Sequence, residues 1–310
     1  MKKLKKYKVI IDTDPGVDDT NALIYMLNDP QFDIKLFTIS HGNIAIKNAT
    51  RNMCHILDLL DKDIPVVVGY DERLGGSTED AAFLHGEQGL GGYTPPKNTK
   101  HKPLKKDCAD AMYEVLKENP KETTLIILGP HTNAAHLFMK YPDAKDMIKN
   151  IIMMGGAPYG TKQNPNHCSF NIRVDVPAFK ETLKTNLPVV MCPSSIGRDK
   201  ANFTEEQVNE IQKTNNLGEF LVKTYETYYE PGYAEKIVAT NDISAVYYLT
   251  HPKLYKTKKA FIEVNEKGKI TAHDNRKGNF TIVVDVKRKK LMKMFFEKLR
   301  EMSDIKIKLK

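Results

Sequence analysis

Four aspartates stand close together near the amino terminus of the chain: Asp12, Asp14, Asp18 and Asp19. Carboxylates this close repel one another unless a positive charge lies among them, and a hard divalent cation with oxygen ligands is the natural partner. The alternative is a solvated acidic turn with a helix cap. The second pair, Asp18-Asp19, favours the metal site over the turn.

The residues around these aspartates predict a strand, a turn and a helix. An apolar run, Val9 to Ile11, leads into Asp12, a Pro-Gly turn follows, and a helical pattern begins at about Val17. Open α/β sheets place their ligand sites at the carboxyl ends of strands. The dipole of a helix favours anions in its first turn. We therefore expect a ligand site at this edge of a sheet.

Short apolar runs alternate with helical patterns along much of the chain. Strands are expected at residues 8–12, 34–39, 65–68, 123–128, 149–154 and 188–191. Helices are expected at residues 17–28, 45–61, 105–118, 131–140 and 175–185. Strands separated by helices of this length predict parallel pairing with right-handed crossovers.

The last part of the chain has a different pattern. Strands are expected at residues 260–264, 269–273 and 280–285, followed by a basic amphipathic helix at 289–302. No linker marks a domain boundary. The predicted fold is therefore α/β, with residues 1–310 in a single domain: a Rossmann-like, doubly wound, mostly parallel sheet with helices on both faces and a small C-terminal β extension.

Three segments interrupt this alternation. Residues 70–103 are rich in glycine and proline, and residues 156–170 form a second loop rich in glycine, proline and asparagine. Long loops inside a compact domain are usually functional. Residues 221–242 are rich in tyrosine.

The composition argues against several classes of protein. A hydrophobic content of 41% and a charged content of 28% are typical of a soluble globular chain. The net charge of +8 comes with basic runs mostly near the two ends, and no aromatic and basic module for nucleic acid is visible. The four cysteines form no C-x-x-C pair, which fits a reducing compartment. Because neither a signal peptide nor a membrane-spanning run is visible, we expect a cytoplasmic protein.

Further motifs follow the aspartates in a fixed order. The opening motif, D-x-D-P-G-x-D-D, spans Asp12 to Asp19. The later motifs are Gly42-Asn43, His85-Gly86-x-x-Gly89, Gly129-Pro130-x-Thr132-Asn133, Met154-Gly155-Gly156, Phe170-Asn171 and Asp242. As an ordered set they resemble the inosine-uridine-preferring nucleoside hydrolases, which cleave the N-glycosidic bond of ribonucleosides with a bound calcium ion.

The resemblance implies a Ca²⁺ site and a role for each motif residue. The implied metal ligands are hard oxygen donors: Asp14, Asp19, Asp242 and the backbone carbonyl of Thr132. Asp14 resembles the general base, which takes a proton from a water whose pKa the metal lowers. The implied ribose-binding residues are Asp18, Asn43, Met154, Asn171 and Asp242. The implied reaction releases a free base and ribose, as in purine and pyrimidine salvage, and the family commonly forms homodimers or homotetramers.

The late site departs from the family pattern. Many members carry a His before the last aspartate and use it to protonate the leaving base, whereas this chain has Asn241. An amide cannot act as a general acid near neutral pH, and the chain has no Trp on which a base could stack. The candidates for activating the leaving base are His85, Tyr225, Tyr228, Tyr229 and Tyr233. Of the tyrosines, Tyr229 and Tyr233 are favoured, although the cluster is equally typical of a helix face packed on the core.

The sugar site departs as well. The family's E-F-N motif reads Ser169-Phe170-Asn171 here, so the Glu that normally helps to hold the 5′ end of the sugar is missing. A shorter, neutral Ser predicts an altered 5′ pocket, which is either larger or filled by Asn164, Asn166 or His167. Cys168 beside His167 is a weak candidate nucleophile, because catalytic pairs meet in space rather than along the chain.

Two other functions stay open. A nucleoside- or ribose-binding protein with weak or lost hydrolase activity would explain Asn241 and Ser169. A phosphatase of the haloacid-dehalogenase type shares the D-x-D motif, but it usually continues with Gly-Thr or Gly-Val, and Pro15-Gly16 is the wrong sequel. The leading interpretation is a Ca²⁺-dependent ribonucleoside hydrolase that acts on small-molecule nucleosides and not on nucleic acid.

Overall fold

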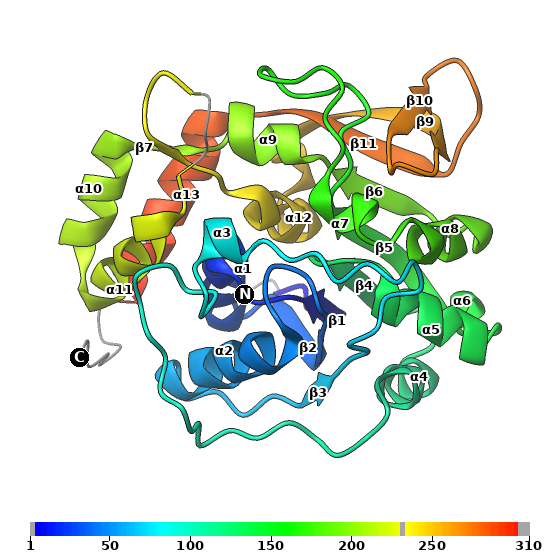
Figure 1. Cartoon of the computed structure of the whole chain (residues 1–310), viewed down its shortest axis with the longest axis horizontal. Coiled ribbons are helices and arrows are strands. Elements are labelled where there is room, and N and C mark those ends of the chain that lie inside the picture. Colours follow the sequence, from blue (N-terminus) through cyan, green and yellow to red (C-terminus); the bar gives the residue numbers. More distant parts are fainter. Residues whose placement is uncertain (1–3, 230–232, 303–310) are drawn as a thin grey trace.

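The computed structural model describes residues 4–229 and 233–302. Its centre is a nine-stranded sheet in the order β10-β9-β11-β6-β5-β4-β1-β2-β3 (Figure 1). The strands of the first part are β1 (Tyr7–Thr13), β2 (Phe32–Ile39), β3 (Val66–Val68), β4 (Thr123–Ile127), β5 (Ile148–Met154) and β6 (Val189–Cys192). The later strands are β9 (Tyr255–Val264), β10 (Ile270–His273) and β11 (Phe280–Val286). A separate two-stranded sheet consists of β7 (Phe203–Thr204) and β8 (Ile237–Val238).

The strand order reverses beside β1. Strands β2 and β3 extend the sheet on one side of β1, whereas β4, β5 and β6 extend it on the other, and all of these pairs are parallel. This reversal is the topological switch point at which open α/β sheets bind ligands. Strand β11 pairs parallel with β6, and β9 and β10 then add antiparallel pairs. The doubly wound fold with a C-terminal β extension is therefore confirmed.

Helices cover both faces of the sheet. One hydrophobic core contains Val9 and Ile11 of β1, and the other contains Ile10, because successive side chains of a strand point to opposite faces. The first core is covered by α1 (Val17–Asn28), α2 (Ile46–Leu59), α10 (Glu205–Thr214), α11 (Asn216–Thr224), α12 (Asn241–Thr250) and α13 (Arg288–Glu301). The second is covered by α4 (Cys108–Glu118), α5 (Thr132–Lys140) and α8 (Val176–Lys184).

Shorter helices lie in the connections. They are α3 (Ala82–His85), α6 (Ala144–Met147), α7 (Phe170–Arg173) and α9 (Ser194–Asp199). Every strand and helix expected from the sequence is present, with ends shifted by a few residues. Strands β7 and β8 and helices α3, α6, α7 and α9 to α12 were not expected. Within the two described ranges, no helix has the length and apolar character needed to cross a membrane.

Candidate active site

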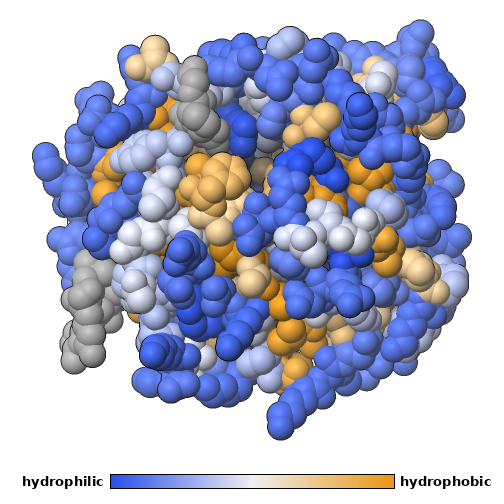
Figure 2. Space-filling view, viewed as in Figure 1, coloured by the Kyte–Doolittle hydropathy of each residue, from blue (hydrophilic) through white to orange (hydrophobic). Residues whose placement is uncertain are grey.

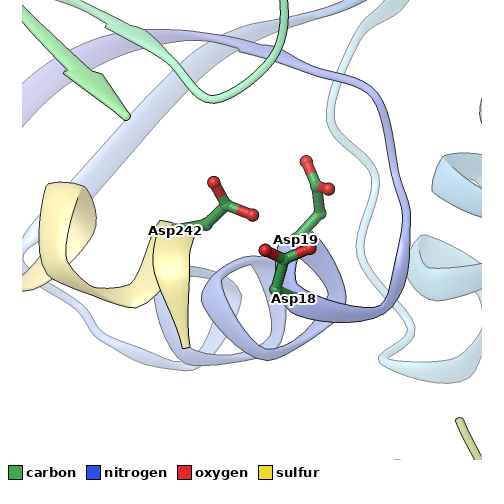
Figure 3. Close-up of side chains that lie close together, drawn as sticks. All are labelled: Asp18, Asp19 and Asp242. Atoms are coloured by element: carbon green, nitrogen blue, oxygen red, sulfur yellow. The ribbon is translucent and has the colours of Figure 1, made fainter. Parts of the chain in front are cut away.

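Three aspartates from opposite ends of the chain meet at the switch point. Asp18 and Asp19 lie in the first turn of α1, and Asp242 lies in the first turn of α12 (Figure 3). One oxygen atom of each carboxylate lies within 4.8 Å of the others. Helices α1 and α12 pack directly on each other, so the helix that follows β1 and the late helix together bring these carboxylates into one place.

Asp14 lies beside this group and is linked to it through Asn43. One oxygen of Asp14 accepts a hydrogen bond from the backbone N–H of Asn43 at 2.7 Å. The side-chain amide of Asn43 donates to Asp19 at 2.8 Å. Asp19 also accepts from the hydroxyl of Thr13 at 2.5 Å and from the backbone N–H of Gly16 at 3.1 Å. The turn after β1 and the end of β2 therefore fix the orientation of Asp14 and Asp19.

The buried carboxylates are electrostatically suited to a cation. Burial, together with repulsion from neighbouring aspartates, raises the pKa of Asp19 to about 7 and raises the pKa values of Asp14 and Asp242 well above their usual range. Among the described residues, the Oδ1 atoms of Asp14, Asp18 and Asp242 have no hydrogen-bond donor. Buried acceptors without donors are costly, and a hard cation with oxygen ligands would satisfy all three. The residues present therefore fit a metal ion.

Thr132 begins α5, directly after β4, on the other side of the switch point. It is buried, and its hydroxyl donates to Asp175 at 2.6 Å. Asp175 also accepts from the backbone N–H groups of Leu74 and Gly75, so it ties the turn at Thr132 to the long loop after β3.

A cavity of about 230 Å³ opens beside the aspartates. Its acidic part contains Asp18 and Asp242, with Asn43 and Asn241 beside them. Its rim includes Phe83 of α3, whose side chain is 84% exposed. Figure 2 shows that this face of the molecule is mostly hydrophilic, with apolar side chains gathered over α3.

Neutral hydrogen-bonding groups line a second part of the cavity. The Nδ1 atom of His85 accepts from the backbone N–H of Val17 at 3.1 Å, which places the proton of the neutral ring on Nε2. Burial lowers the pKa of His85 to about 4. Its ring centre lies 4.9 Å from that of Tyr228. The amide of Asn241 donates to Asp18 at 3.0 Å and to the hydroxyl oxygen of Tyr228 at 3.3 Å. At neutral pH these groups can therefore offer a ligand hydrogen bonds but not a proton.

A third part of the cavity is formed by the segment that begins at Ser169. The amide of Asn171 donates to the backbone carbonyl of Leu128 and to the sulfur of Met154, at 3.4 Å in the second case. Ser169, Asn171 and Met154 are all buried and line the cavity. The structure therefore brings these sequence-predicted residues together with Asp18, Asn43, His85, Asn241 and Asp242.

Three other predicted residues are not among the described residues that line this cavity. Asn164 is exposed and bonds within its own loop to Thr161. The hydroxyl of Tyr233 donates to Asp199 at 2.6 Å, and the ring of Tyr229 lies 5.3 Å from the ammonium group of Lys236. Tyr229 and Tyr233 flank residues 230–232, which lie outside the described ranges.

Sequence reasoning missed several residues that line the cavity. Glu79 and Phe83 come from the long loop after β3, Arg173 from α7, and Arg198 from α9. The position of Arg198 shortly after a predicted strand was the available signal, because ligand sites gather at the carboxyl ends of strands. Glu79 and Phe83 had only the general expectation that a long loop is functional.

Comparison with known proteins identifies a single family. The family model described as inosine-uridine preferring nucleoside hydrolase matches residues 9–293. The non-specific ribonucleoside hydrolase RihC of Salmonella enteritidis is 33% identical over 278 residues, which cover 90% of this chain and 87% of that protein. RihC of Salmonella typhi matches to the same extent.

Solved structures show the same fold. A plant nucleoside hydrolase, PpNRh1, superposes with a TM-score of 0.87 at 26% identity, covering 95% of this chain and 99% of that one. A purine-preferring ribonucleoside hydrolase from Gardnerella vaginalis superposes with a TM-score of 0.86 at 24% identity, covering 96% and 100% of the two chains.

Proposed function

Because this chain belongs to the inosine-uridine preferring nucleoside hydrolase family, we propose that it hydrolyses ribonucleosides to a free base and ribose. The observation that carries the proposal is the buried group of Asp18, Asp19 and Asp242, whose oxygens lie within 4.8 Å of one another at the switch point of the sheet. The cavity beside them holds amide and imidazole groups suited to a sugar and a base.

The metal is proposed to be Ca²⁺, held by Asp14, Asp19, Asp242 and the backbone carbonyl of Thr132. The support is that Oδ1 of Asp14 and Oδ1 of Asp242 are buried without donors and that an oxygen of Asp19 lies within 4.8 Å of one of Asp242, because Ca²⁺ takes six to eight oxygen ligands. When bound, the ion would supply orientation of the sugar hydroxyls and a lower pKa for the attacking water.

The residues of the chain have separate roles in this proposal. Asp14 takes a proton from the attacking water. Negative charge from the buried aspartates stabilises the oxocarbenium-like transition state. Asp18, Asn43 and Asn171, with Met154 beside them, bind the ribose hydroxyls, since carboxylate and amide oxygens accept hydrogen bonds and the amide NH₂ donates them.

The leaving base needs hydrogen-bond donors rather than a general acid. His85 and Tyr228 line the cavity, and Asn241 holds the hydroxyl oxygen of Tyr228. Tyr229 and Tyr233 stay candidates from the sequence. A binding protein without hydrolase activity is not favoured, because the relatives at 33% identity are named as hydrolases.

The remaining properties are also proposals. We propose that residues 1–310 act as a single domain, supported by one continuous sheet and by a family match over residues 9–293. The family resemblance implies a homodimer or homotetramer. A cytoplasmic site of action is supported by four free cysteines, as a reducing compartment allows.

A nucleoside panel with and without a chelator tests the function. The purified protein is expected to release base and ribose from at least one ribonucleoside. EGTA should abolish turnover, and added Ca²⁺ should restore it. Because general base catalysis typically contributes a hundredfold or more, Asp14→Ala should lower kcat/KM by at least about that factor.

Asp143→Ala is the matched control, because Asp143 is exposed and bonds to Tyr113. It should keep wild-type turnover. If no nucleoside turns over with Ca²⁺ present, the hydrolase proposal is wrong. Full activity after complete chelation would instead refute the calcium requirement.

A further inference from the structure

A carboxylate from the long loop after β3 reaches the cavity wall that contains Ser169. Glu79 lines the cavity together with Ser169 and Arg173. Its carboxylate forms two parallel hydrogen bonds with the guanidinium of Arg173, one of them 2.8 Å long. The backbone N–H of Arg173 donates to the carbonyl of Ser169 at 3.0 Å, so Arg173 lies one helical turn from Ser169. Arg173 therefore joins Glu79 to the segment that carries Ser169.

The backbone of Glu79 is held as firmly as its side chain. Arg73 is buried, at 4% exposure, and donates to the carbonyl of Glu79 at 2.6 Å and to the carbonyl of His41 at 3.2 Å. The guanidinium groups of Arg73 and Arg173 lie 6.0 Å and 5.7 Å from the ring centre of Phe170. Arg73, which is buried and multiply bonded, therefore fixes the backbone of the loop at Glu79, whereas Arg173 holds the Glu79 carboxylate from an exposed position.

Glu79 stays ionised at neutral pH. The neighbouring Arg173 guanidinium lowers the pKa of the Glu79 carboxyl below its usual range. The bidentate pair leaves lone pairs on both carboxylate oxygens, since a carboxylate can accept about four hydrogen bonds. Glu79 can therefore accept a hydrogen bond from a ligand without leaving Arg173.

The walls of the cavity indicate which part of a nucleoside would reach Glu79. This step rests on the proposed function. The aspartates take the hydroxyls nearest the reacting carbon, and the part with His85 and Tyr228 takes the base. The wall with Ser169 and Glu79 is left for the 5′ end of the sugar. Ser169 is short and neutral, whereas Glu79 brings a carboxylate to this wall.

We propose that Glu79, positioned by Arg173, binds the 5′-hydroxyl of the substrate. The two groups come from different segments of the chain, and together they present one acceptor where Ser169 offers only a small hydroxyl. A carboxylate accepts a hydrogen bond from a hydroxyl, and a 5′-deoxy sugar has no hydroxyl to donate there. The enzyme should therefore prefer nucleosides with a free 5′-hydroxyl over 5′-deoxynucleosides.

The test compares Glu79→Gln with the wild type on two substrate pairs: inosine with 5′-deoxyinosine, and uridine with 5′-deoxyuridine. Hydrogen bonds to charged groups are the strong ones, so the wild type should prefer the hydroxylated substrate by about tenfold or more in kcat/KM. In Glu79→Gln this preference should fall toward one. The loss should come from slower turnover of the hydroxylated substrate, with the 5′-deoxy substrate unchanged.

Glu122→Gln is the matched control, because Glu122 also forms an exposed ion pair, with Lys8 at 2.6 Å. It should keep the wild-type preference. An unchanged preference in Glu79→Gln would overturn the proposal, and so would a wild-type enzyme that turns over the 5′-deoxy and the hydroxylated substrates equally well.

Different results would refute the proposed function and the proposed role of Glu79. If the wild type hydrolyses no nucleoside, the proposed function is wrong. Calorimetry with inosine and 5′-deoxyinosine then still decides the role of Glu79. Tighter binding of inosine that is lost in Glu79→Gln supports it, and equal binding of the two compounds, or binding of neither, overturns it.

Discussion

Two of the residues proposed to lie around the leaving base, Asn241 and His85, are not acids of ordinary strength. Asn241 is an amide, and the buried ring of His85 has a pKa lowered to about 4, so neither is a proton donor in the enzyme at neutral pH. Hydrogen bonds are one means of stabilising a departing base, and a tyrosine hydroxyl is a suitable donor. Tyr228 is buried against His85 and bonded to Asn241.

A series of three Tyr→Phe variants tests which hydroxyl acts on the base. Because losing one hydrogen bond costs about 1 kcal/mol or more, Tyr228→Phe should lower kcat by roughly tenfold on the best nucleoside. Tyr229→Phe and Tyr233→Phe serve as comparisons, measured by the same steady-state assay. If either of these variants lowers kcat and Tyr228→Phe does not, that other tyrosine activates the leaving base and Tyr228 does not.

The candidate site could be predicted where its residues lie in one short motif. Asp14, Asp18 and Asp19 follow a single strand, so their spacing alone indicates a cation site. Glu79 and Arg198 could not be predicted in this way, because loop geometry and packing, rather than periodicity, place them in the cavity. The choice among the tyrosines had the same difficulty, since the sequence gives no direction to a side chain beside a turn.

At the scale of elements, Asp175 joins three parts of the fold. It caps α8 by accepting from the backbone N–H of Ala178 at 3.3 Å, and it accepts from Leu74, Gly75 and the hydroxyl of Thr132. The helix after β5, the loop after β3 and the start of α5 therefore share one buried carboxylate. The same loop carries Glu79 and Phe83 to the cavity.

Asp175→Ala should lower the free energy of unfolding by about 3 kcal/mol, because it removes a helix cap and leaves buried donors unpaired. It should also raise KM, since the loop that lines the cavity loses its anchor. Thr204→Ala is the control, because Thr204 caps α10 by accepting from Gln207. It should cost about 1 kcal/mol. Urea unfolding and steady-state kinetics measure both effects, and equal losses in the two variants would contradict the anchoring role.

The elements themselves were predictable where their pattern was simple. Continuous apolar runs indicated buried parallel strands, and α2 and α8 have one apolar face. Helix α12 was missed because most of its residues are buried, including Asn241 and Asp242, so it shows no amphipathic pattern. Helix α9 spans only six residues and contains Gly197, which lowers its helical propensity.

For the whole molecule, buried histidines make stability depend on pH. His55, a buried residue of α2, bonds to the hydroxyl of Tyr93 at 2.9 Å. Burial lowers its pKa to about 4, and the Arg51 charge lowers it further while Asp58 opposes this. The folded-state pKa therefore lies below the unfolded value of about 6.5. The stabilisation is present above about pH 6.5 and is lost as the pH falls toward 4.

Urea unfolding in EGTA at pH 7 and pH 5 measures how much His55 contributes to the pH dependence of stability. As the pH falls from 7 to 5, His55 takes up a proton mainly in the unfolded state, and this should lower the free energy of unfolding by about 2 kcal/mol. The wild type should therefore lose about that much more stability than His55→Gln. Tyr93→Phe removes the partner without removing the titrating group, so it should keep the wild-type pH dependence. Identical slopes in the wild type and His55→Gln would contradict the assignment.

The carboxylates that face one another at the switch point come from opposite ends of the chain, and this has a consequence for biosynthesis. Strands β1 to β6 leave the ribosome before α12 is made, so the nascent polypeptide carries its early aspartates without Asp242. An ion that needs Asp242 as a ligand would bind tightly only after α12 has been synthesised and has packed on α1. The site would thus act as a check of completeness, since a truncated polypeptide that stops before Asn241 would neither retain the cation nor cleave a nucleoside.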